Sequence, residues 1–169
     1  MKTLKVIRDS DIGSDEAAPQ EYKERKAARA VVFDEEGKVA IFHSTKNHYH
    51  KLPGGGVEEG EDIETGLRRE LVEEIGCEVE DIKELGVIEE YRNKLKVYQV
   101  NYGFTAKVRG EKGNPHLEQG EIDDGFVTEW IDLGTAIETL EKDKNSDLYE
   151  AKYMVTRDLT FLKEAKRST

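Results

Sequence analysis

Residues 55–77, GGVEEGEDIETGLRRELVEEIGC, carry eight acidic side chains in a stretch of 23 and form the most informative pattern in this chain of 169 residues. Across Ile63–Ile75 an apolar residue recurs every four positions, which predicts a helix with one buried face. Asp62 is a suitable N-cap for this helix, and Gly76 is a suitable residue to end it. The segment therefore predicts an amphipathic helix that packs against a core.

Three carboxylates of this helix fall together beside its apolar face. At about 100° per residue, Glu70, Glu73 and Glu74 span an arc of roughly 100° that overlaps the apolar stripe instead of opposing it. Carboxylates that converge beside a core repel one another and lose water, which raises their pKa values unless a cation lies between them. Clustered carboxylate oxygens are the ligands that Mg²⁺ or Mn²⁺ prefers. The competing interpretation is a solvated acidic face.

Glycine and two basic residues surround this helix. Gly54, Gly55 and Gly56 lack the side chains that would keep a backbone from approaching a phosphate. Their segment follows a proline and is expected to form neither regular helix nor a central strand. Arg69 could orient a carboxylate or contact a phosphate, and Lys51 could contact a base or phosphate. Each of these signals is weak alone and gains weight from the glutamates beside it.

The rest of the chain mixes strands and helices, which indicates an α+β or three-layer domain. Residues 2–8 predict a strand or extended arm and residues 9–25 a polar linker, so we separate residues 1–25 from a domain over 26–169. Within that domain the patterns predict a β-hairpin (Ala27–Phe33 and Val39–Phe42), three strands (Val79–Tyr91, Leu95–Val108 and Phe126–Ile131), two closing helices (Ala136–Lys142 and Asp147–Lys163), and polar loops over 44–51 and 110–125.

Composition limits the classes of function. The formal net charge of −11 disfavours binding to DNA, RNA or an anionic membrane surface, although a small anion can still enter with a metal ion. No apolar run is long enough for a transmembrane helix, and the first residues do not read as a signal peptide. The single cysteine, Cys77, forbids an internal disulfide and is typical of a reducing cytoplasm. We therefore expect a cytoplasmic protein whose partner is a small molecule.

The segment resembles the Nudix box, G-x5-E-x7-R-E-U-x-E-E-x-G-U, where U is apolar. The match runs from Gly55 through Glu61, Arg69-Glu70-Leu71 and Glu73-Glu74 to Gly76-Cys77, with every fixed position at the right spacing and a cysteine at the final apolar position. The box covers 23 of 169 residues, and Leu52-Pro53-Gly54 is similar to the family's lead-in. The resemblance implies an α/β/α sandwich with a mixed β-sheet, of MutT type.

The resemblance also implies roles for individual residues. Glu73 and Glu74 match the principal metal ligands, Glu70 matches a position that serves as ligand or general base, and the carbonyl of Gly54 matches a further ligand. Arg69 matches the residue that orients the glutamate helix, and Glu61 matches a structural or metal-supporting position. Many members supply an extra carboxylate from a later loop. Here that loop offers four candidates, of which Glu121 is favoured over the others (Glu118, Asp123 and Asp124).

The implied activity is Mg²⁺-dependent or Mn²⁺-dependent hydrolysis of a nucleoside diphosphate linked to another moiety. The proline that marks ADP-ribose pyrophosphatases is absent from Glu90–Asn93, and Tyr91 misses the place associated with dinucleoside polyphosphate hydrolases. By elimination, a nucleoside triphosphate cleaved to monophosphate and pyrophosphate is favoured. The alternatives are a nucleotide-sugar or dinucleoside polyphosphate hydrolase, or a catalytically silent nucleotide-binding module. His48 and His50 have the spacing of a metal pair, but a surface loop is the favoured interpretation. The oligomeric state stays open, a homodimer included.

Overall fold

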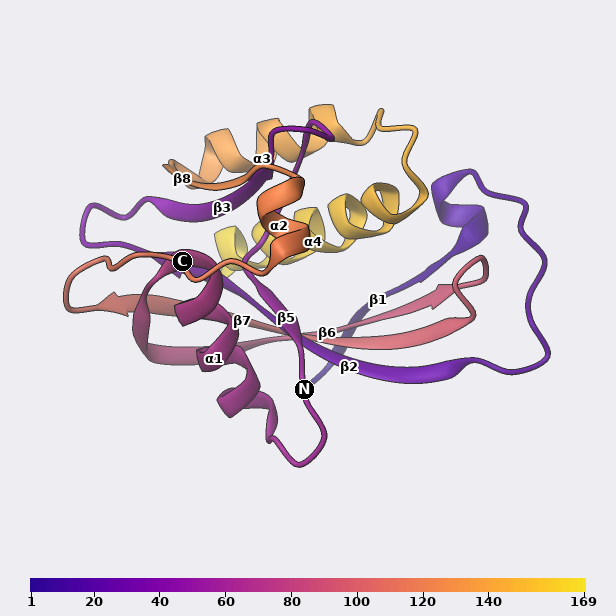
Figure 1. Ribbon diagram of the computed structural model, residues 1–169, viewed down its shortest axis with the longest axis horizontal. Helices are drawn as coiled ribbons and strands as arrows, with labels where there is room; N and C mark the ends of the chain where they lie inside the picture. Colours follow the sequence, from indigo (N-terminus) through magenta and orange to yellow (C-terminus); the bar gives the residue numbers. More distant parts are fainter.

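The computed structural model describes residues 1–169 and contains one large mixed sheet with helices on both faces (Figure 1). The strands are β1 (Thr3–Arg8), β2 (Lys23–Phe33), β3 (Val39–Ser44), β4 (Tyr49–Lys51), β5 (Gly54–Gly56), β6 (Glu78–Arg92), β7 (Val97–Arg109) and β8 (Phe126–Ile131). The helices are η1, a 3₁₀ turn (Asp9–Ile12), α1 (Ile63–Ile75), α2 (Gln119–Asp123), α3 (Leu133–Asp143) and α4 (Tyr149–Ser168).

The sheet is mixed, as predicted. Its main order is β1-β6-β7-β2-β3-β4, with β5 on β2 and β8 on β3. The pairs β1·β6 and β2·β7 are parallel, whereas the remaining pairs are antiparallel. The predicted hairpin is confirmed, because Phe33 of β2 pairs with Val39 of β3.

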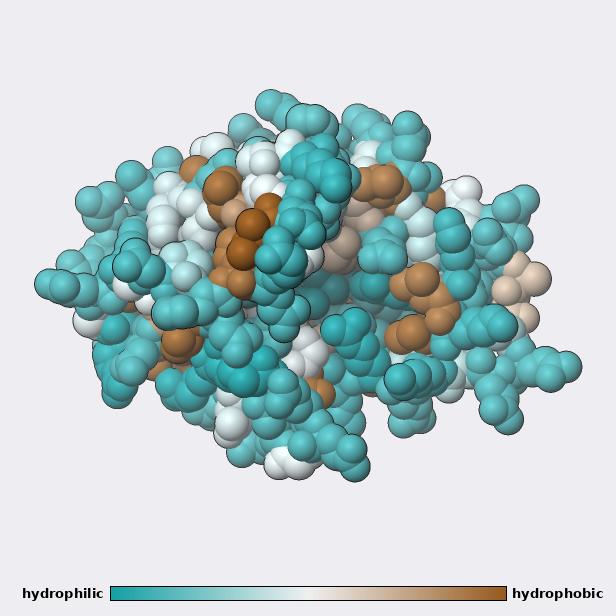
Figure 2. All heavy atoms as spheres, viewed as in Figure 1, coloured by the Kyte–Doolittle hydropathy of each residue, from teal (hydrophilic) through white to brown (hydrophobic).

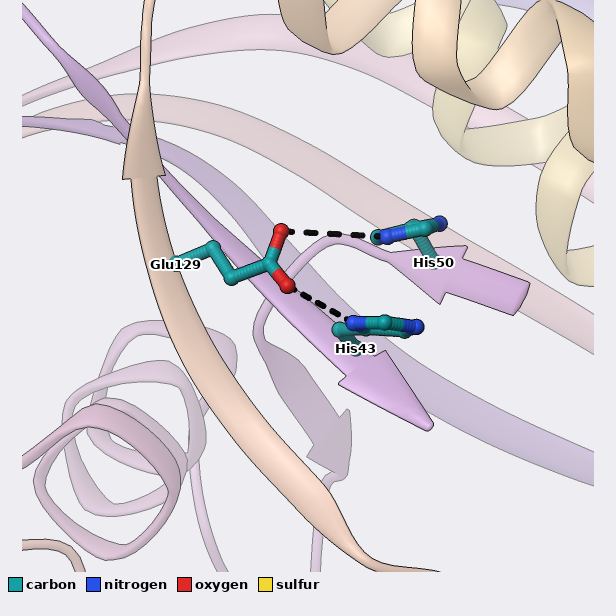
Figure 3. Close-up of side chains that lie close together, drawn as sticks. All are labelled: His43, His50 and Glu129. Atoms are coloured by element: carbon teal, nitrogen blue, oxygen red, sulfur yellow. Dashed lines mark hydrogen bonds and ion pairs between the residues drawn. The ribbon is translucent and has the colours of Figure 1, made fainter. Parts of the chain in front are cut away.

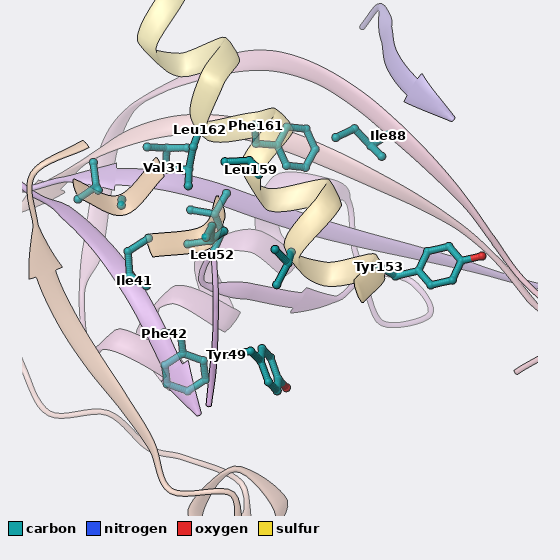
Figure 4. Close-up of a cluster of buried hydrophobic side chains, with 14 of the residues drawn as sticks. Val31, Ile41, Phe42, Tyr49, Leu52, Ile88, Tyr153, Leu159, Phe161 and Leu162 are labelled. Atoms are coloured by element: carbon teal, nitrogen blue, oxygen red, sulfur yellow. The ribbon is translucent and has the colours of Figure 1, made fainter. Parts of the chain in front are cut away.

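Two apolar layers enclose the sheet and give the predicted α/β/α sandwich. Leu67, Leu71 and Ile75 of α1 pack with small residues of β2 such as Ala28 and Ala30 on one face. On the other face, side chains from α3 and α4 form the larger core with β2, β3 and β6 (Figure 4). The alternation of side chains along β2 assigns its residues to the two layers in turn.

Helix α1 begins and ends at the residues that the sequence indicated. The Asp62 carboxylate accepts a hydrogen bond from the Thr65 amide at 2.8 Å. At the other end Gly76 adopts φ 66°, its amide donates to the carbonyl of Val72, and the next amide, that of Cys77, donates to the carbonyl of Leu71. A left-handed residue here lets the chain leave the helix at once for β6, which favours glycine because it has no Cβ.

The glycine segment is neither helix nor a central strand, as predicted, but it is regular: Gly54–Gly56 forms β5, which pairs with Ala27–Arg29 of β2 alone. The two backbones approach so closely that a Cβ on Gly54 would lie 2.2 Å from the carbonyl oxygen of Ala28. Absence of side chains therefore permits this strand instead of preventing it. Two predicted loops are also partly regular. Residues 44–51 contain the end of β3 and all of β4, and residues 110–125 contain α2.

The N-terminal segment contributes a strand to the same sheet. Strand β1 runs parallel to β6, and η1 follows it within the predicted linker. The buried Asp9 accepts hydrogen bonds from the hydroxyls of Tyr149 and Tyr153 on α4 and from the amide of Asn93. The linker therefore begins with a fixed contact to α4, whereas the division at residues 25 and 26 stays a prediction.

The visible face of the molecule is mainly hydrophilic, with apolar side chains in small separate groups (Figure 2). This surface agrees with a chain in which 37% of the residues are charged. No helix of the structure has the length and apolar character needed to cross a membrane.

Candidate active site

Arg69 is the centre of an ion-pair network on α1. Its Nε donates to Glu61 Oε1 at 2.8 Å, and its Nη1 donates to Glu70 Oε1 at 2.8 Å and to Glu73 Oε2 at 3.3 Å. Its Nη2 donates to the carbonyl oxygen of Gly56 at 2.9 Å, which ties the helix to β5. These contacts agree with the orienting role predicted for Arg69, because one rigid guanidinium holds several carboxylates and the glycine segment together.

Glu61 lies in the loop before α1 and is held by the same arginine. Its Oε2 also accepts a hydrogen bond from the Glu58 amide at 2.9 Å. The hydrogen bonds from Arg69 and from that amide lower the pKa of Glu61 to about 2, so it stays ionised at neutral pH. Its position supports a structural role, because its charge is already matched by Arg69.

Glu74 points from α1 into the interior, where its side chain is only 5% exposed. Its Oε2 accepts a hydrogen bond from the Gly54 amide at 2.6 Å, and its Oε1 lies 3.4 Å from Lys51 Nζ. Burial raises the pKa of Glu74 to about 7, even though Lys51, Arg29 and the Gly54 amide act in the opposite direction. This carboxylate is therefore short of positive charge.

The Glu70 carboxylate rests against the backbone of β5. A Cβ on Gly55 would lie 2.2 Å from Glu70 Oε2, so this contact exists only because residue 55 is glycine. On the neighbouring residue, a Cβ on Gly56 would lie 3.0 Å from Nη2 of Arg25. The glycine segment is thus flanked by a carboxylate on one side and a guanidinium on the other.

The donor set fits a hard divalent cation. Glu70, Glu73 and Glu74 present carboxylates from neighbouring turns of one helix, and their charges are matched only in part by Arg69 and Lys51. Carboxylate oxygens are the preferred ligands of Mg²⁺ and Mn²⁺, and a cation would favour the ionised form of the buried Glu74. The Gly54 amide faces Glu74, whereas a ligand role for the Gly54 carbonyl stays a prediction.

Glu121 belongs to the short helix α2, which the sequence did not indicate. Its Oε1 accepts a hydrogen bond from the Glu118 amide at 2.9 Å, and the two residues form a capping box. Its negative charge is one of the smaller causes of the raised pKa of Glu74, after burial of that carboxylate. The predicted role of Glu121 as an extra carboxylate of the site stays a prediction, since its side chain here caps α2.

A buried ion pair on α4 positions the chain that leads to the glycines, and the sequence reading missed it. Asp158 Oδ2 accepts a hydrogen bond from the Leu52 amide at 2.8 Å, and Arg157 Nη2 donates to the same oxygen at 3.0 Å. Both charged side chains are fully buried. Because Asp158 is 106 positions from Leu52, no local pattern could have revealed the contact.

Arg29 is a second buried charge that the sequence reading missed. It lies on β2, opposite Gly54 of β5, and its Nε and Nη1 have no hydrogen-bond partner. Burial lowers the pKa of Arg29 to about 10, while Asp158 and Glu74 act to raise it. Its charge partly offsets that of Glu74, which explains how a carboxylate can be buried at this place.

Comparison with known proteins agrees with this geometry. A sequence model of the NUDIX domain matches residues 23–152. Among curated proteins, an RNA pyrophosphohydrolase of Pseudoalteromonas atlantica is 32% identical over 83 residues, which are 48% of each chain. Another, from Wolbachia pipientis, is 33% identical over 66 residues, covering 37% of this chain and 40% of that protein. The chain thus spans less than half the length of these curated relatives.

Solved structures show the same fold. A NUDIX hydrolase from Nitrosomonas europaea superposes with a TM-score of 0.64 at 15% identity, covering 86% of this chain and 90% of that one. A MutT protein from Methanosarcina mazei gives a TM-score of 0.57 at 17% identity, covering 89% and 99%. An ADP-ribose pyrophosphatase from Streptococcus suis gives 0.53 at 20% identity, covering 85% and 92%. Since the NUDIX match spans well over half of the sequence, the chain belongs to the Nudix hydrolase family.

Proposed function

We propose that this chain is a Mg²⁺-dependent or Mn²⁺-dependent pyrophosphohydrolase that cleaves a nucleoside diphosphate linked to another moiety. The observation that carries the proposal is the placement of Glu70 and Glu74 from one side of α1 against the side-chain-free backbone of Gly55 and Gly54, with Glu73 joined to Glu70 through Arg69. Membership of the Nudix family supports the same class of reaction.

Each group of the site has a task in this reaction. The three glutamates would hold the metal, whose charge polarises the phosphoryl group and lowers the pKa of the attacking water. Arg69 fixes Glu70 and Glu73 in position, and the Gly55 backbone leaves room for the diphosphate. Preorganised charges of this kind stabilise charge that develops on the leaving oxygen without further reorganisation.

Glu70 is the proposed general base. Its carboxylate lies at the β5 backbone, where the diphosphate would sit, and Arg69 keeps it oriented. A base must reach the proton of the attacking water within hydrogen-bond distance, so the proposal requires that water to lie beside the Glu70 carboxylate. Glu121 is the second candidate, and it would first have to release the Glu118 amide.

The favoured substrate is a nucleoside triphosphate, released as monophosphate and pyrophosphate. Lys51 and Arg25 provide positive charge at two sides of the glutamates and glycines, which suits a polyanionic phosphate chain. A second candidate is the 5′-triphosphate end of an RNA, because both curated relatives are named RNA pyrophosphohydrolases. The net charge of −11 argues against contact with a long polyanion.

The test is turnover with Mg²⁺ on a panel of nucleoside triphosphates, nucleotide sugars, dinucleoside polyphosphates and a 5′-triphosphorylated RNA, with product identification. Glu73→Gln and Glu74→Gln should each lower kcat at least about a hundredfold, because each removes a charge that stabilises the transition state. The matched control is Glu64→Gln, on the same helix but paired with Arg68, which should leave kcat unchanged.

The outcomes separate the alternatives. Release of pyrophosphate from nucleoside triphosphates, but not from RNA, supports the favoured substrate. Turnover that persists in Glu73→Gln and Glu74→Gln, or without any divalent metal, contradicts the assigned site. If no member of the panel is hydrolysed while a nucleotide still binds in the presence of Mg²⁺, the chain is a silent binding module and the proposal fails.

A further inference from the structure

Two histidines and a glutamate from three neighbouring strands meet on the sheet face that carries α3 (Figure 3). His43 of β3 is the cross-strand partner of His50 on β4. Glu129 lies on β8, which also pairs with β3, at a position diagonal to His43. Successive side chains of a strand point to opposite faces. Lys51, the next residue after His50, accordingly points to Glu74, so the cluster lies on the other side of β4 from the glutamate site.

The ligand atoms of this cluster lie near one another. His43 Nδ1 lies 2.7 Å from Glu129 Oε1, and His50 Nε2 lies 3.8 Å from Glu129 Oε2. The two imidazole rings are stacked with centroids 3.9 Å apart. All three ligand atoms lie within 4.8 Å of one another, so small side-chain movements would bring them to the roughly 3.3 Å spacing of ligands around a tetrahedral zinc ion with bonds of about 2.0 Å.

Asp143, the last residue of α3, fixes the orientation of His50. Its Oδ2 lies 2.7 Å from His50 Nδ1 and also accepts a hydrogen bond from the His50 amide at 2.7 Å. A carboxylate only accepts, so the proton is on Nδ1 and the lone pair of a neutral His50 is on Nε2, which faces Glu129. A carboxylate that orients a histidine in this way is the usual outer contact of a zinc ligand.

Charge points in the same direction. The carboxylates of Glu129 and Asp143 bring two formal negative charges to a half-buried place beside the rings. One divalent ion between the rings and Glu129 would offset this negative charge.

We propose that His43, His50 and Glu129 bind one Zn²⁺ ion, or another divalent transition metal, with Asp143 as the partner that orients His50. Two imidazole nitrogens and one carboxylate are a donor set for such metals and a poor one for Mg²⁺. Solvent reaches the cluster, because the Glu129 side chain is 37% exposed. Binding requires the rings to turn out of their near-parallel stack and Glu129 to give up its bond to His43.

The ion would join β3, β4, β8 and the end of α3. Strand β4 leads through Leu52 to the glycine segment. A metal at His50 would therefore hold in place the segment whose Lys51 side chain and Gly54 amide contact Glu74. His48 takes no part, because it is exposed in the turn before β4 with φ 55°. The histidine pair is therefore His43 with His50 across the hairpin, and not the adjacent His48 with His50.

The test is titration of the metal-free chain with Co²⁺ in excess Mg²⁺, which keeps the glutamate site occupied by the harder ion. We expect one equivalent of Co²⁺ with the visible absorption of a tetrahedral or five-coordinate site, displaced by one equivalent of Zn²⁺. Zn²⁺ should also raise the Tm under the same conditions, because it binds the folded state. Neither readout depends on hydrolysis.

The variants make the assignment specific. His43→Gln and His50→Gln should abolish the absorption, and Asp143→Asn should weaken binding by about 10–100-fold. His48→Asn, a residue type that tolerates a positive φ, is the matched control and should bind as the native chain does. Co²⁺ that binds the native chain no tighter than His43→Gln and His50→Gln overturns the proposal. If circular dichroism shows those two unfolded, Glu129→Gln replaces them, and undiminished binding by that variant overturns it equally.

Discussion

Replacing Glu74 with Gln should remove most of the pH dependence of folding stability between pH 4.5 and 7 in the absence of metal. Burial raises the pKa of Glu74 from 4.5 to about 7. Between these values the folded chain binds a proton that the unfolded chain has released, so the free energy of unfolding falls as pH rises. Below pH 4.5 both states are protonated, and above pH 7 both are ionised.

The magnitude follows from the pKa difference. At about 1.4 kcal/mol per pH unit, a rise from 4.5 to about 7 corresponds to a loss of about 3 kcal/mol of stability across this window. The side chain is only 5% exposed, so solvent screening reduces this figure little. The Gln variant carries no charge at any pH and should lack this contribution, while all other titrating groups remain the same.

The assay is urea unfolding of both chains in EDTA at several pH values from 4.5 to 8, with Glu73→Gln as the control for a more exposed glutamate of the same helix. The comparison uses the difference in slope, so a constant cost of leaving Lys51 unpaired cancels. Mg²⁺ at about 100 times its Kd should restore about 2.7 kcal/mol to the native chain at pH 8 and much less to Glu74→Gln. Parallel pH profiles for the native chain and Glu74→Gln would refute the reasoning, since Glu74 would then be ionised freely in the folded state.

Three further substitutions test the supports of the site. Gly55→Ala should lower kcat/KM by about a hundredfold while the circular dichroism spectrum stays unchanged. The new Cβ would lie 2.2 Å from Glu70 Oε2 and must displace that carboxylate. Activity near the native level would argue against a role for Glu70. Arg69→Lys keeps the charge but loses the planar fork, so Mg²⁺ affinity measured by calorimetry should fall by about 10–100-fold, and an unchanged affinity would show that orientation is set elsewhere. Gly76→Ala should destabilise the chain by about 2 kcal/mol in urea unfolding. Residue 76 has φ 66°, and its Cβ would lie 2.5 Å from the Gly113 carbonyl oxygen. A loss under about 0.5 kcal/mol would mean that the segment around Gly113 moves aside freely.

Local patterns predicted those parts of the structure whose determinants lie within one turn or one hairpin. The capping of α1 by Asp62 and Gly76 follows from hydrogen bonds between residues at most six positions apart. The β2–β3 hairpin follows from a connection of five residues, 34–38, in which the Asp34 side chain accepts hydrogen bonds from the amides of Glu36 and Lys38. The same spacing put the three glutamates on one side of α1.

Other features escaped prediction because their causes are distant in sequence. Gly54–Gly56 has no strand pattern of its own, yet β2 supplies a partner that makes it a strand. The Asp158 carboxylate on the last helix accepts a hydrogen bond from the Leu52 amide, and no sequence pattern near either residue predicts this contact. The histidines show the same limit, since the spacing of His48 and His50 favoured a surface loop, whereas the fold brings His43 and His50 together on the paired strands β3 and β4.

The sequence by itself determined the family, the helix that carries the glutamates, and which residue types could hold a metal beside a diphosphate. Tertiary structure decided the electrostatics of the site, because a pKa depends on burial and on charges that arrive from other elements. Lys51 from β4, the Gly54 amide and the depth of the α1 face together set the pKa of Glu74. Spacing along a helix places a carboxylate, but only the packing around it decides how strongly that carboxylate attracts a cation.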